Sequence, residues 1–298
     1  MKNLHADEVE TDPSLVRRLL ATQFPRWADL PIGRVPSSGT DNALYRLGDD
    51  LVARLPRVER AVPDADTDAW LPKLAPHLPL AVPEKLATGM PGDGYPWRWS
   101  IYRWLHGETI TPEGLTDPLQ AARDLARFVG VLEGIDATGG PLPARDRRGG
   151  PLAPRDGRVR AAIAACGDLI DARTVTAAWE DALAAPAWDG APVWVHGDLQ
   201  AGNVLGRDGH LSAVIDWGAL AVGDPACDLL AAWSLFSAHA RDVFRAELGS
   251  DEATWRRGRG WALSTALIAL PYYLHTNPGI VANSRRKIAE VLADSAQT

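Results

Sequence analysis

One segment of this 298-residue chain constrains its fold more than any other, the stretch from Val193 to Asp228. A short apolar run there leads into a polar loop that contains His196, Asp198 and Asn203. A second apolar run ends just before Asp216. Two strands joined by a turn bring the residue before the first strand and the residue after the second to the same end of the pair. The pattern therefore predicts that Asn203 and Asp216 lie close together.

The residue types in this segment suit phosphoryl transfer. An asparagine amide oxygen and an aspartate carboxylate are hard oxygen ligands, which suit Mg²⁺ held jointly with substrate phosphates. Asp198, five residues before Asn203, offers a carboxylate that can accept a proton from a hydroxyl group. A catalytic aspartate, an asparagine five residues later and a second aspartate after a short strand form the kinase template. The sequence thus predicts Asp198 as the catalytic residue and Asn203 and Asp216 as metal ligands.

At these residues the sequence resembles the aminoglycoside phosphotransferase family, which is related to the protein kinases. That family's catalytic loop reads H-G-D-x-x-x-x-N, and Gly197 stands where eukaryotic protein kinases have arginine. A looser likeness extends to residues 99–108, which look like the family's hinge, and to residues 37–42, which look like its nucleotide-positioning loop. The specific part of the resemblance rests on His196–Asn203, on Ile215–Trp217 and on Gly223–Asp228.

The resemblance implies a fold and a reaction. The fold would be α+β and protein-kinase-like, with a small β-rich N-terminal lobe and a larger, mainly helical C-terminal lobe. ATP or GTP would bind together with Mg²⁺, and Asp198 would orient or deprotonate an acceptor hydroxyl. Asp228 would brace the catalytic loop from the following helix, and His196 is expected to be a buried structural histidine that hydrogen-bonds the loop. Positioning and metal neutralisation would supply most of the rate, because the transition state is loose.

The resemblance also assigns a nucleotide site. Ser38 would lie in the positioning loop, and the hinge backbone from Arg103 to Leu105 would contact the base. One departure concerns the lysine that the family places on its third strand to reach the phosphates. The chain has Arg54 there, and an arginine can still donate to phosphate. The acidic partner of Arg54 is left open among Asp64, Asp66 and Asp68.

The remaining sequence agrees with a division near Leu105. Up to that point, short apolar runs separated by turns indicate a mainly antiparallel sheet with a helix or two. Beyond it, apolar residues recur mostly at helical spacing. The expected units are a nucleotide-binding lobe over residues 1–105 and a catalytic and substrate-binding lobe over residues 106–298. The expected strands are 32–35, 43–47, 51–55, 85–88, 99–105 and 193–195. A first helix is expected to begin at residues 12–13. The other expected helices cover 69–75, 119–132, 161–183 (in one or two pieces), 226–236, 251–274 and 281–292.

Composition narrows the class of protein. The formal net charge is −7, which disfavours nucleic acid or an anionic membrane as a partner and would tolerate a cationic ligand. The N-terminus lacks the apolar core of a signal peptide, and two cysteines make no disulfide framework, so we expect a cytoplasmic protein. We also expect the protein to be a monomer or a homodimer. The chain contains no Walker A, G-x-S-x-G, C-x-x-C, H-E-x-x-H or G-x-G-x-x-G motif.

Three function classes remain open from the sequence. The first is a small-molecule O-phosphotransferase that acts on an aminoglycoside- or macrolide-like antibiotic. The second is a metabolic kinase for choline, a thio-sugar or homoserine, which would use the same catalytic residues. The third is a non-catalytic nucleotide-binding relative, suggested by Arg54 and by the lack of an evident partner glutamate. A cluster of arginines could bind an anion, but a solvated loop is the favoured interpretation; it comprises Arg145, Arg147, Arg148, Arg155, Arg158 and Arg160.

Overall fold

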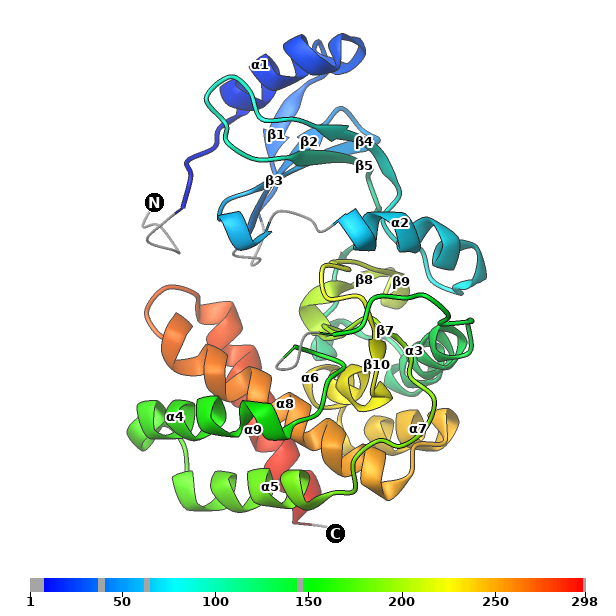
Figure 1. Ribbon diagram of the computed structural model, residues 1–298, viewed down its shortest axis with the longest axis vertical. Coiled ribbons are helices and arrows are strands. Elements are labelled where there is room, and N and C mark those ends of the chain that lie inside the picture. The colour runs from blue at the N-terminus through cyan, green and yellow to red at the C-terminus, as the bar shows by residue number, and fades with distance from the viewer. Residues whose placement is uncertain (1–7, 37–40, 62–64, 144–146, 297–298) are drawn as a thin grey trace. The chain divides into compact units, whose positions relative to one another are not determined.

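The computed structural model describes residues 8–36, 41–61, 65–143 and 147–296. At residue 60 and at residues 65–68 it describes only the backbone. The chain divides into two compact units (Figure 1). The first comprises Met1–Lys73 and Ala81–His106, and the second comprises Leu74–Leu80 and Gly107–Thr298. Each unit has its own secondary structure and its own core.

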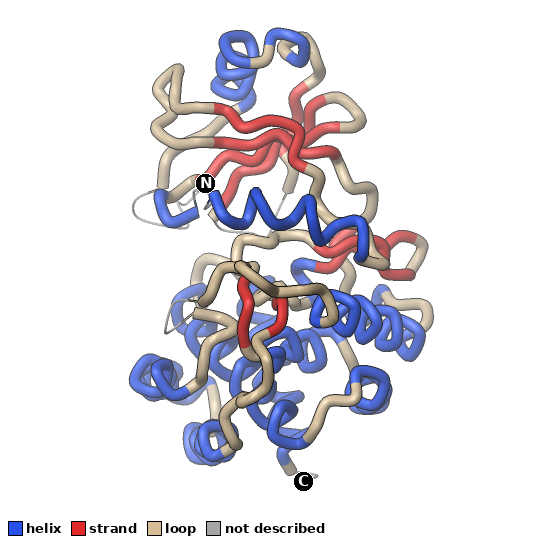
Figure 2. The backbone as a smooth tube through the Cα atoms, turned by 45° about the vertical axis from the view of Figure 1, so that its right-hand side comes forward, coloured by secondary structure: helices blue, strands red, loops and turns tan. Residues whose placement is uncertain are grey.

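A β-sheet forms the framework of the first unit (Figure 2). It has five strands in the order β1-β2-β3-β5-β4, and all neighbours are antiparallel. Burial alternates along the second strand, as expected when one face of a sheet covers a core. The strands are β1 (Ile32–Arg34), β2 (Asn42–Leu47), β3 (Leu51–Pro56), β4 (Lys85–Gly89) and β5 (Trp99–Arg103).

Helix α1 (Pro13–Gln23) covers the core of this sheet. It begins at Asp12, whose carboxylate accepts a hydrogen bond from the backbone nitrogen of Leu15 at 2.7 Å, and Pro13 suits its first turn. The buried face of the helix joins one apolar cluster with residues of the sheet such as Tyr45 and Trp99. The unit also contains η1 (Pro25–Trp27), η2 (Glu59–Ala61) and most of α2 (Ala65–Leu74).

The second unit is mainly helical and carries two small sheets, β10-β7 and β6-β8-β9. Helix α8 packs against α4, α5, α9 and η8, and α3 packs against α7. The strands are β6 (Glu108–Thr109), β7 (Val193–Val195), β8 (Val204–Arg207), β9 (His210–Val214) and β10 (Ala221–Gly223). The α-helices are α3 (Pro118–Glu133), α4 (Asp156–Cys166), α5 (Ala172–Ala184), α6 (Ala231–Leu235), α7 (Ala238–Leu248), α8 (Glu252–Tyr273) and α9 (Pro278–Ser295). The 3-10 helices are η3 (Ala75–His77), η4 (Pro112–Gly114), η5 (Ala153–Arg155), η6 (Gly167–Leu169), η7 (Ala201–Asn203) and η8 (Pro225–Leu230).

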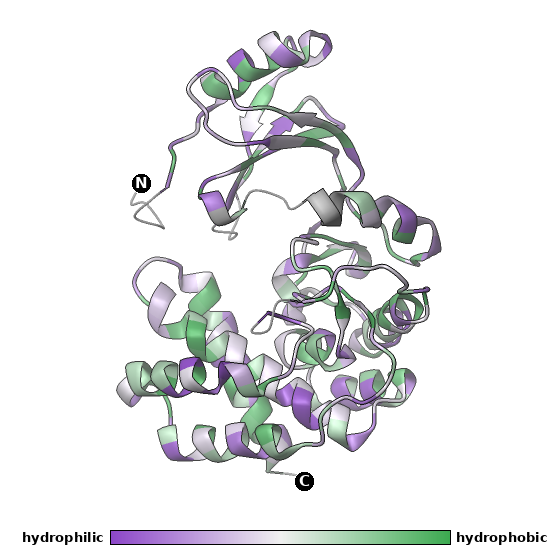
Figure 3. Cartoon of the chain, in the orientation of Figure 1, coloured by the Kyte–Doolittle hydropathy of each residue, from purple (hydrophilic) through white to green (hydrophobic). Residues whose placement is uncertain are grey.

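Hydrophobic and hydrophilic residues mix along these helices (Figure 3). Within the described residues, no helix combines the length and the apolar character that crossing a membrane requires.

Two expected elements differ from those observed. The segment 226–236, expected to be one α-helix, winds as the 3-10 helix η8 before the short α6. This tighter winding occurs in a fully buried segment whose Asp228 carboxylate is bound to the backbone of another loop. The strand expected to reach Leu105 ends at Arg103. The backbone nitrogen of Trp104 still donates to the carbonyl oxygen of Asp50 in the register of β3 and β5, but Asp50 belongs to the turn before β3, so the pairing ends there.

Candidate active site

Two pairs of short strands position the polar loop of the second unit. Strand β7, which leads into the loop, pairs with β10, and β8, which follows it, pairs with β9 so that Val204 faces Val214. The backbone nitrogen of Ile215 donates to the carbonyl oxygen of Asn203 at 2.9 Å. Asn203 and Asp216 therefore flank the same end of this strand pair, as the sequence pattern predicts.

His196 is fully buried and makes three hydrogen bonds. Its backbone nitrogen donates to Asp228 Oδ2 at 2.6 Å, and its Nε2 contacts the carbonyl oxygen of Ile215 at 3.0 Å. Its Nδ1 accepts from the backbone nitrogen of Asp198 at 3.1 Å, so the proton of the neutral ring belongs on Nε2. Burial lowers the pKa of His196 to about 4. The ring, which packs edge-on against Trp217, is therefore a neutral structural support at neutral pH.

The backbone conformation and the close surroundings of Gly197 require glycine at this position of the loop. Its φ is +79°, in the left-handed region, and a Cβ atom would come within 2.4 Å of the carbonyl oxygen of Ala219. Its backbone nitrogen donates to Asp228 Oδ1 at 2.8 Å. Both oxygens of the buried Asp228 carboxylate thus hold the backbone of the loop, and burial raises the pKa of Asp228 to about 6.

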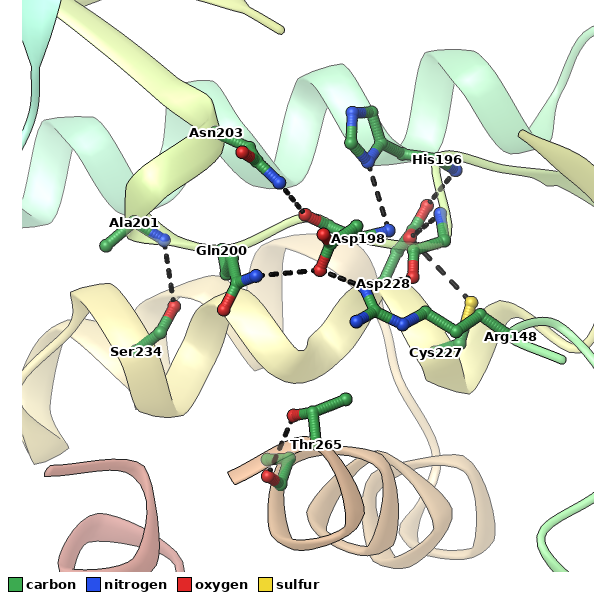
Figure 4. A network of polar contacts seen from close by, with 12 residues as sticks. Arg148, His196, Asp198, Gln200, Ala201, Asn203, Cys227, Asp228, Ser234 and Thr265 are labelled. Atoms are coloured by element: carbon green, nitrogen blue, oxygen red, sulfur yellow. Dashed lines mark hydrogen bonds and ion pairs between the residues drawn. The ribbon is translucent and has the colours of Figure 1, made fainter. Parts of the chain in front are cut away.

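Asp198 lies at the centre of a network of polar contacts (Figure 4). Its carbonyl oxygen accepts from Asn203 Nδ2 at 2.8 Å, and its Oδ1 accepts from Gln200 Nε2 at 2.8 Å. Arg148 Nη1 forms an ion pair with the same Oδ1 and donates to the carbonyl oxygen of Gly197 at 3.0 Å. The Asp198 side chain stays 22% exposed, so its carboxylate is both firmly held and accessible to a ligand.

Asn203 and Asp216 could supply oxygen ligands to a divalent cation. Because the Asn203 amide nitrogen is engaged with Asp198, its amide oxygen is the atom available as a ligand. Asp216 is exposed and adopts a left-handed backbone conformation with φ of +63° at the end of the β8–β9 pair. In the described part of the chain, no three His, Cys, Asp or Glu side chains form a metal cluster. Two oxygen ligands suit Mg²⁺, which completes its shell with water and phosphate oxygens.

The nucleotide residues expected from the resemblance belong to the first unit. Arg54 is half-buried in β3, opposite Leu44 on one side and Ser100 on the other. Arg103 ends β5, and its backbone nitrogen donates to the carbonyl oxygen of Glu84 at 2.9 Å. Leu105 follows the strand and is half-buried. Ser38 and Asp64 lie outside the described residues, as do the side chains of Asp66 and Asp68.

The solvated-loop interpretation of the arginine cluster is wrong for two of its members. Arg148 contacts Asp198, as described above. Arg155 is buried, with its Nε donating to Ser264 Oγ at 2.7 Å and its guanidinium 4.9 Å from the Trp261 ring centre. Composition alone could not separate these two from their exposed neighbours, because the difference comes from tertiary contacts.

Two further polar residues near Asp198 were missed. Gln200 occupies a variable position of the H-G-D-x-x-x-x-N motif, which gives it no signal. Lys287 is buried on α9 and donates from Nζ to Gln200 Oε1 at 3.0 Å. The sequence did hold a signal for Lys287, because it shares a helical face with the buried residues Ser284, Ile288 and Val291. A lysine in the apolar stripe of an amphipathic helix calls for a specific partner.

This site and the two units define a class of protein, a phosphotransferase with a kinase-like fold. Residues 32–261, well over half of the chain, match the model of the phosphotransferase enzyme family, and the chain belongs to that family. No curated protein matches the sequence.

Solved structures show the same fold. The GDP complex of aminoglycoside 2'-phosphotransferase-IIIa is 18% identical with a TM-score of 0.71, covering 96% of this chain and 100% of that one. Macrolide 2'-phosphotransferase MphH from Brachybacterium faecium is 25% identical with a TM-score of 0.58, covering 94% and 97%. Macrolide 2'-phosphotransferase type I is 21% identical with a TM-score of 0.60, covering 94% and 98%. The expected α+β, kinase-like fold class is thereby confirmed.

Proposed function

We propose that this protein transfers the γ-phosphoryl group of ATP or GTP to a hydroxyl group of a small molecule, with Mg²⁺ bound at Asn203 and Asp216. The observation that carries the proposal is the Asp198 carboxylate, which is partly exposed and fixed through its backbone and its Oδ1. A residue that only capped the loop would not need to be held in this way while remaining accessible.

The reaction follows from these residues. The acceptor hydroxyl oxygen forms a bond to the γ-phosphorus while the bond from that phosphorus to the β–γ bridging oxygen breaks, which leaves the nucleoside diphosphate. Asp198 orients the hydroxyl group and receives its proton. A bound Mg²⁺ would neutralise charge on the phosphate oxygens. His196, Gly197 and Asp228 keep the loop rigid, so that Asp198 does not have to be ordered during the reaction.

The nucleotide contacts are proposed for the first unit. Arg54 donates to the phosphates, Ser38 lies in the loop that positions them, and the backbone from Arg103 to Leu105 meets the base. Residues 1–105 then serve as the nucleotide-binding lobe, and residues 106–298 as the catalytic and acceptor-binding lobe. The nucleotide complexes among the solved relatives, with GDP, ADP and ATP, support a nucleotide as co-substrate.

We propose an aminoglycoside- or macrolide-like antibiotic as the acceptor. Solved relatives include complexes with kanamycin and with streptomycin, as well as two macrolide phosphotransferases. The formal net charge of −7 is compatible with a cationic acceptor of this kind.

The test is transfer of labelled γ-phosphate with and without Mg²⁺. ATP and GTP are offered separately with kanamycin, erythromycin or choline, and Asp198→Ala serves as the control. The proposal expects a Mg²⁺-dependent phosphorylated antibiotic that is lost in the variant, while nucleotide binding persists. Phosphorylated choline instead would place the protein among the metabolic kinases. Nucleotide binding without transfer to any acceptor would favour a non-catalytic relative.

A further inference from the structure

Lys287 places its amine in the interior of the second unit, where burial lowers the pKa of that amine to about 7. Its side chain lies on the inner face of α9, and the residue is 3% exposed. Among the described residues, no carboxylate lies within ion-pair distance of its Nζ. Its partners are neutral: Gln200 Oε1 at 3.0 Å and Thr265 Oγ1 at 3.2 Å, the latter hydroxyl donating in turn to the carbonyl oxygen of Ala262. A buried amine without a counter-ion must either carry an unpaired charge or give up its proton, and both cost stability, so packing alone does not account for a lysine here.

The partners of Lys287 fix the orientation of one amide group. The Asp198 carboxylate, which is ion-paired with Arg148, can only accept, so the nitrogen of the Gln200 amide faces it and the oxygen faces the amine of Lys287. Asn283 Nδ2 approaches the same oxygen at 3.4 Å. The amide nitrogen of Gln200 then faces the catalytic loop and donates to Asp198 Oδ1 at 2.8 Å. A flipped amide would place its oxygen against the carboxylate, which is repulsive, and would lose the hydrogen bond that Lys287 donates to Oε1.

This orientation gives the two oxygens of Asp198 different roles. Oδ1 receives both Gln200 and Arg148. No hydrogen bond from a described residue reaches Oδ2, so Oδ2 is the atom left for an acceptor hydroxyl. Figure 4 shows Gln200 and Arg148 approaching the carboxylate from either side.

We propose that Lys287 and Gln200 are positioning residues for phosphoryl transfer. Lys287 locks the Gln200 amide, and the amide holds Oδ1 of Asp198 so that Oδ2 presents itself to the acceptor hydroxyl. The inference rests on the proposed function. It makes helix α9, more than 80 residues beyond the catalytic loop, part of the catalytic geometry. Neither residue touches the reacting atoms, so both act through Asp198.

The test is a double-mutant cycle with Lys287→Met, Gln200→Ala and the double variant. Methionine retains most of the buried stem of the lysine and removes a charge that burial disfavours, so the fold should survive. Activity is measured as phosphate transfer to kanamycin or erythromycin, whichever the wild type modifies. We expect each single variant to lower kcat by about 10- to 100-fold, with the KM for nucleotide within about twofold of wild type. Because Lys287 acts on Asp198 only through the Gln200 amide, the double variant should be no slower than Gln200→Ala alone.

The matched control is Arg285→Met. It removes a cation from the same helix two residues away, where the side chain is exposed, and kcat should not change. An unchanged kcat in Lys287→Met, or single losses that multiply in the double variant, would overturn the positioning role while leaving the proposed function intact. A wild type that transfers no phosphate would overturn the proposed function, and the positioning role with it.

Discussion

The polar loop around Asp198 in the second unit and the five-stranded sheet of the first unit are held in place by different means. In the first unit, backbone ladders set the position of each residue, as for Arg54 between Leu44 and Ser100. In the second unit, short strand pairs fix only the two ends of the loop, and side chains hold the backbone between them, because both Asp228 oxygens bind loop nitrogens and His196 links two segments. A ladder tolerates many side chains, whereas a loop held by side chains depends on particular ones. Substitutions of similar chemistry should therefore have unequal effects in the two units.

The largest difference should appear between two aspartates that accept backbone hydrogen bonds. Asp228→Ala leaves two buried nitrogens of the loop without acceptors, and we expect a loss of about 3 kcal/mol in the free energy of unfolding. Asp12→Ala removes the cap of α1 in the first unit and should cost about 1 kcal/mol. Urea denaturation of both variants measures the difference. Equal losses would show that the loop is not specially dependent on Asp228.

A pair of glycines sharpens the same comparison. Gly197→Ala adds a Cβ atom against the carbonyl oxygen of Ala219 at a positive φ and should cost at least about 2 kcal/mol. Gly33→Ala in β1 meets no atom within 4 Å, and its effect should stay within about 0.5 kcal/mol. Thermal denaturation distinguishes these values. A neutral Gly197→Ala would mean that the loop can move away without loss.

Because His196 is buried, we expect the free energy of unfolding to depend on pH. In the unfolded chain His196 takes up a proton near its ordinary pKa of 6.5, whereas burial keeps the native pKa at about 4. Its contribution to stability is therefore complete above pH 6.5 and is lost as the pH falls towards 4, by up to about 3 kcal/mol.

The comparison between His196→Gln and wild type isolates this contribution from other titrating groups. The difference in unfolding free energy between the two proteins should shrink as the pH falls from 6.5 to 4. His210→Gln alters an exposed side chain and should follow the wild-type curve. A difference that stays constant with pH would contradict a neutral, buried His196.

Much of this architecture could be predicted from local patterns. Alternating apolar residues and short turns predicted the strands of the first unit, and the sequence around Asn203 and Asp216 predicted that they flank one strand pair. The partners of Asp198 could not be predicted in this way. Arg148 reaches it from a loop 50 residues earlier, and Lys287 supports it through Gln200 from a helix near the C-terminus. Those contacts depend on how distant segments pack, which periodicity does not encode.

We expect the smallest effect from a substitution in the five-stranded sheet of the first unit, measured as a change in nucleotide affinity. If Arg54 donates to nucleotide phosphates, Arg54→Met should weaken nucleotide binding by about tenfold, since one charge-assisted contact contributes about 1.4 kcal/mol. Arg34→Met, at an exposed position of β1, is the matched control and should bind nucleotide like wild type. Calorimetric titration with ATP and with GTP measures both. Unchanged binding in Arg54→Met would remove Arg54 from the nucleotide site.

The central claim is that Asp198 carries out the chemistry, and Asp198→Asn tests it most directly. The amide oxygen of asparagine can still accept from Gln200 and Arg148, so the loop and the nucleotide affinity should persist, but the side chain can no longer take a proton. The measurement is kcat for phosphate transfer to the preferred acceptor, with the nucleotide Kd determined on the same preparation. We predict a loss in kcat of about a thousandfold with an unchanged Kd. A variant that retains more than about a tenth of wild-type kcat would contradict the account.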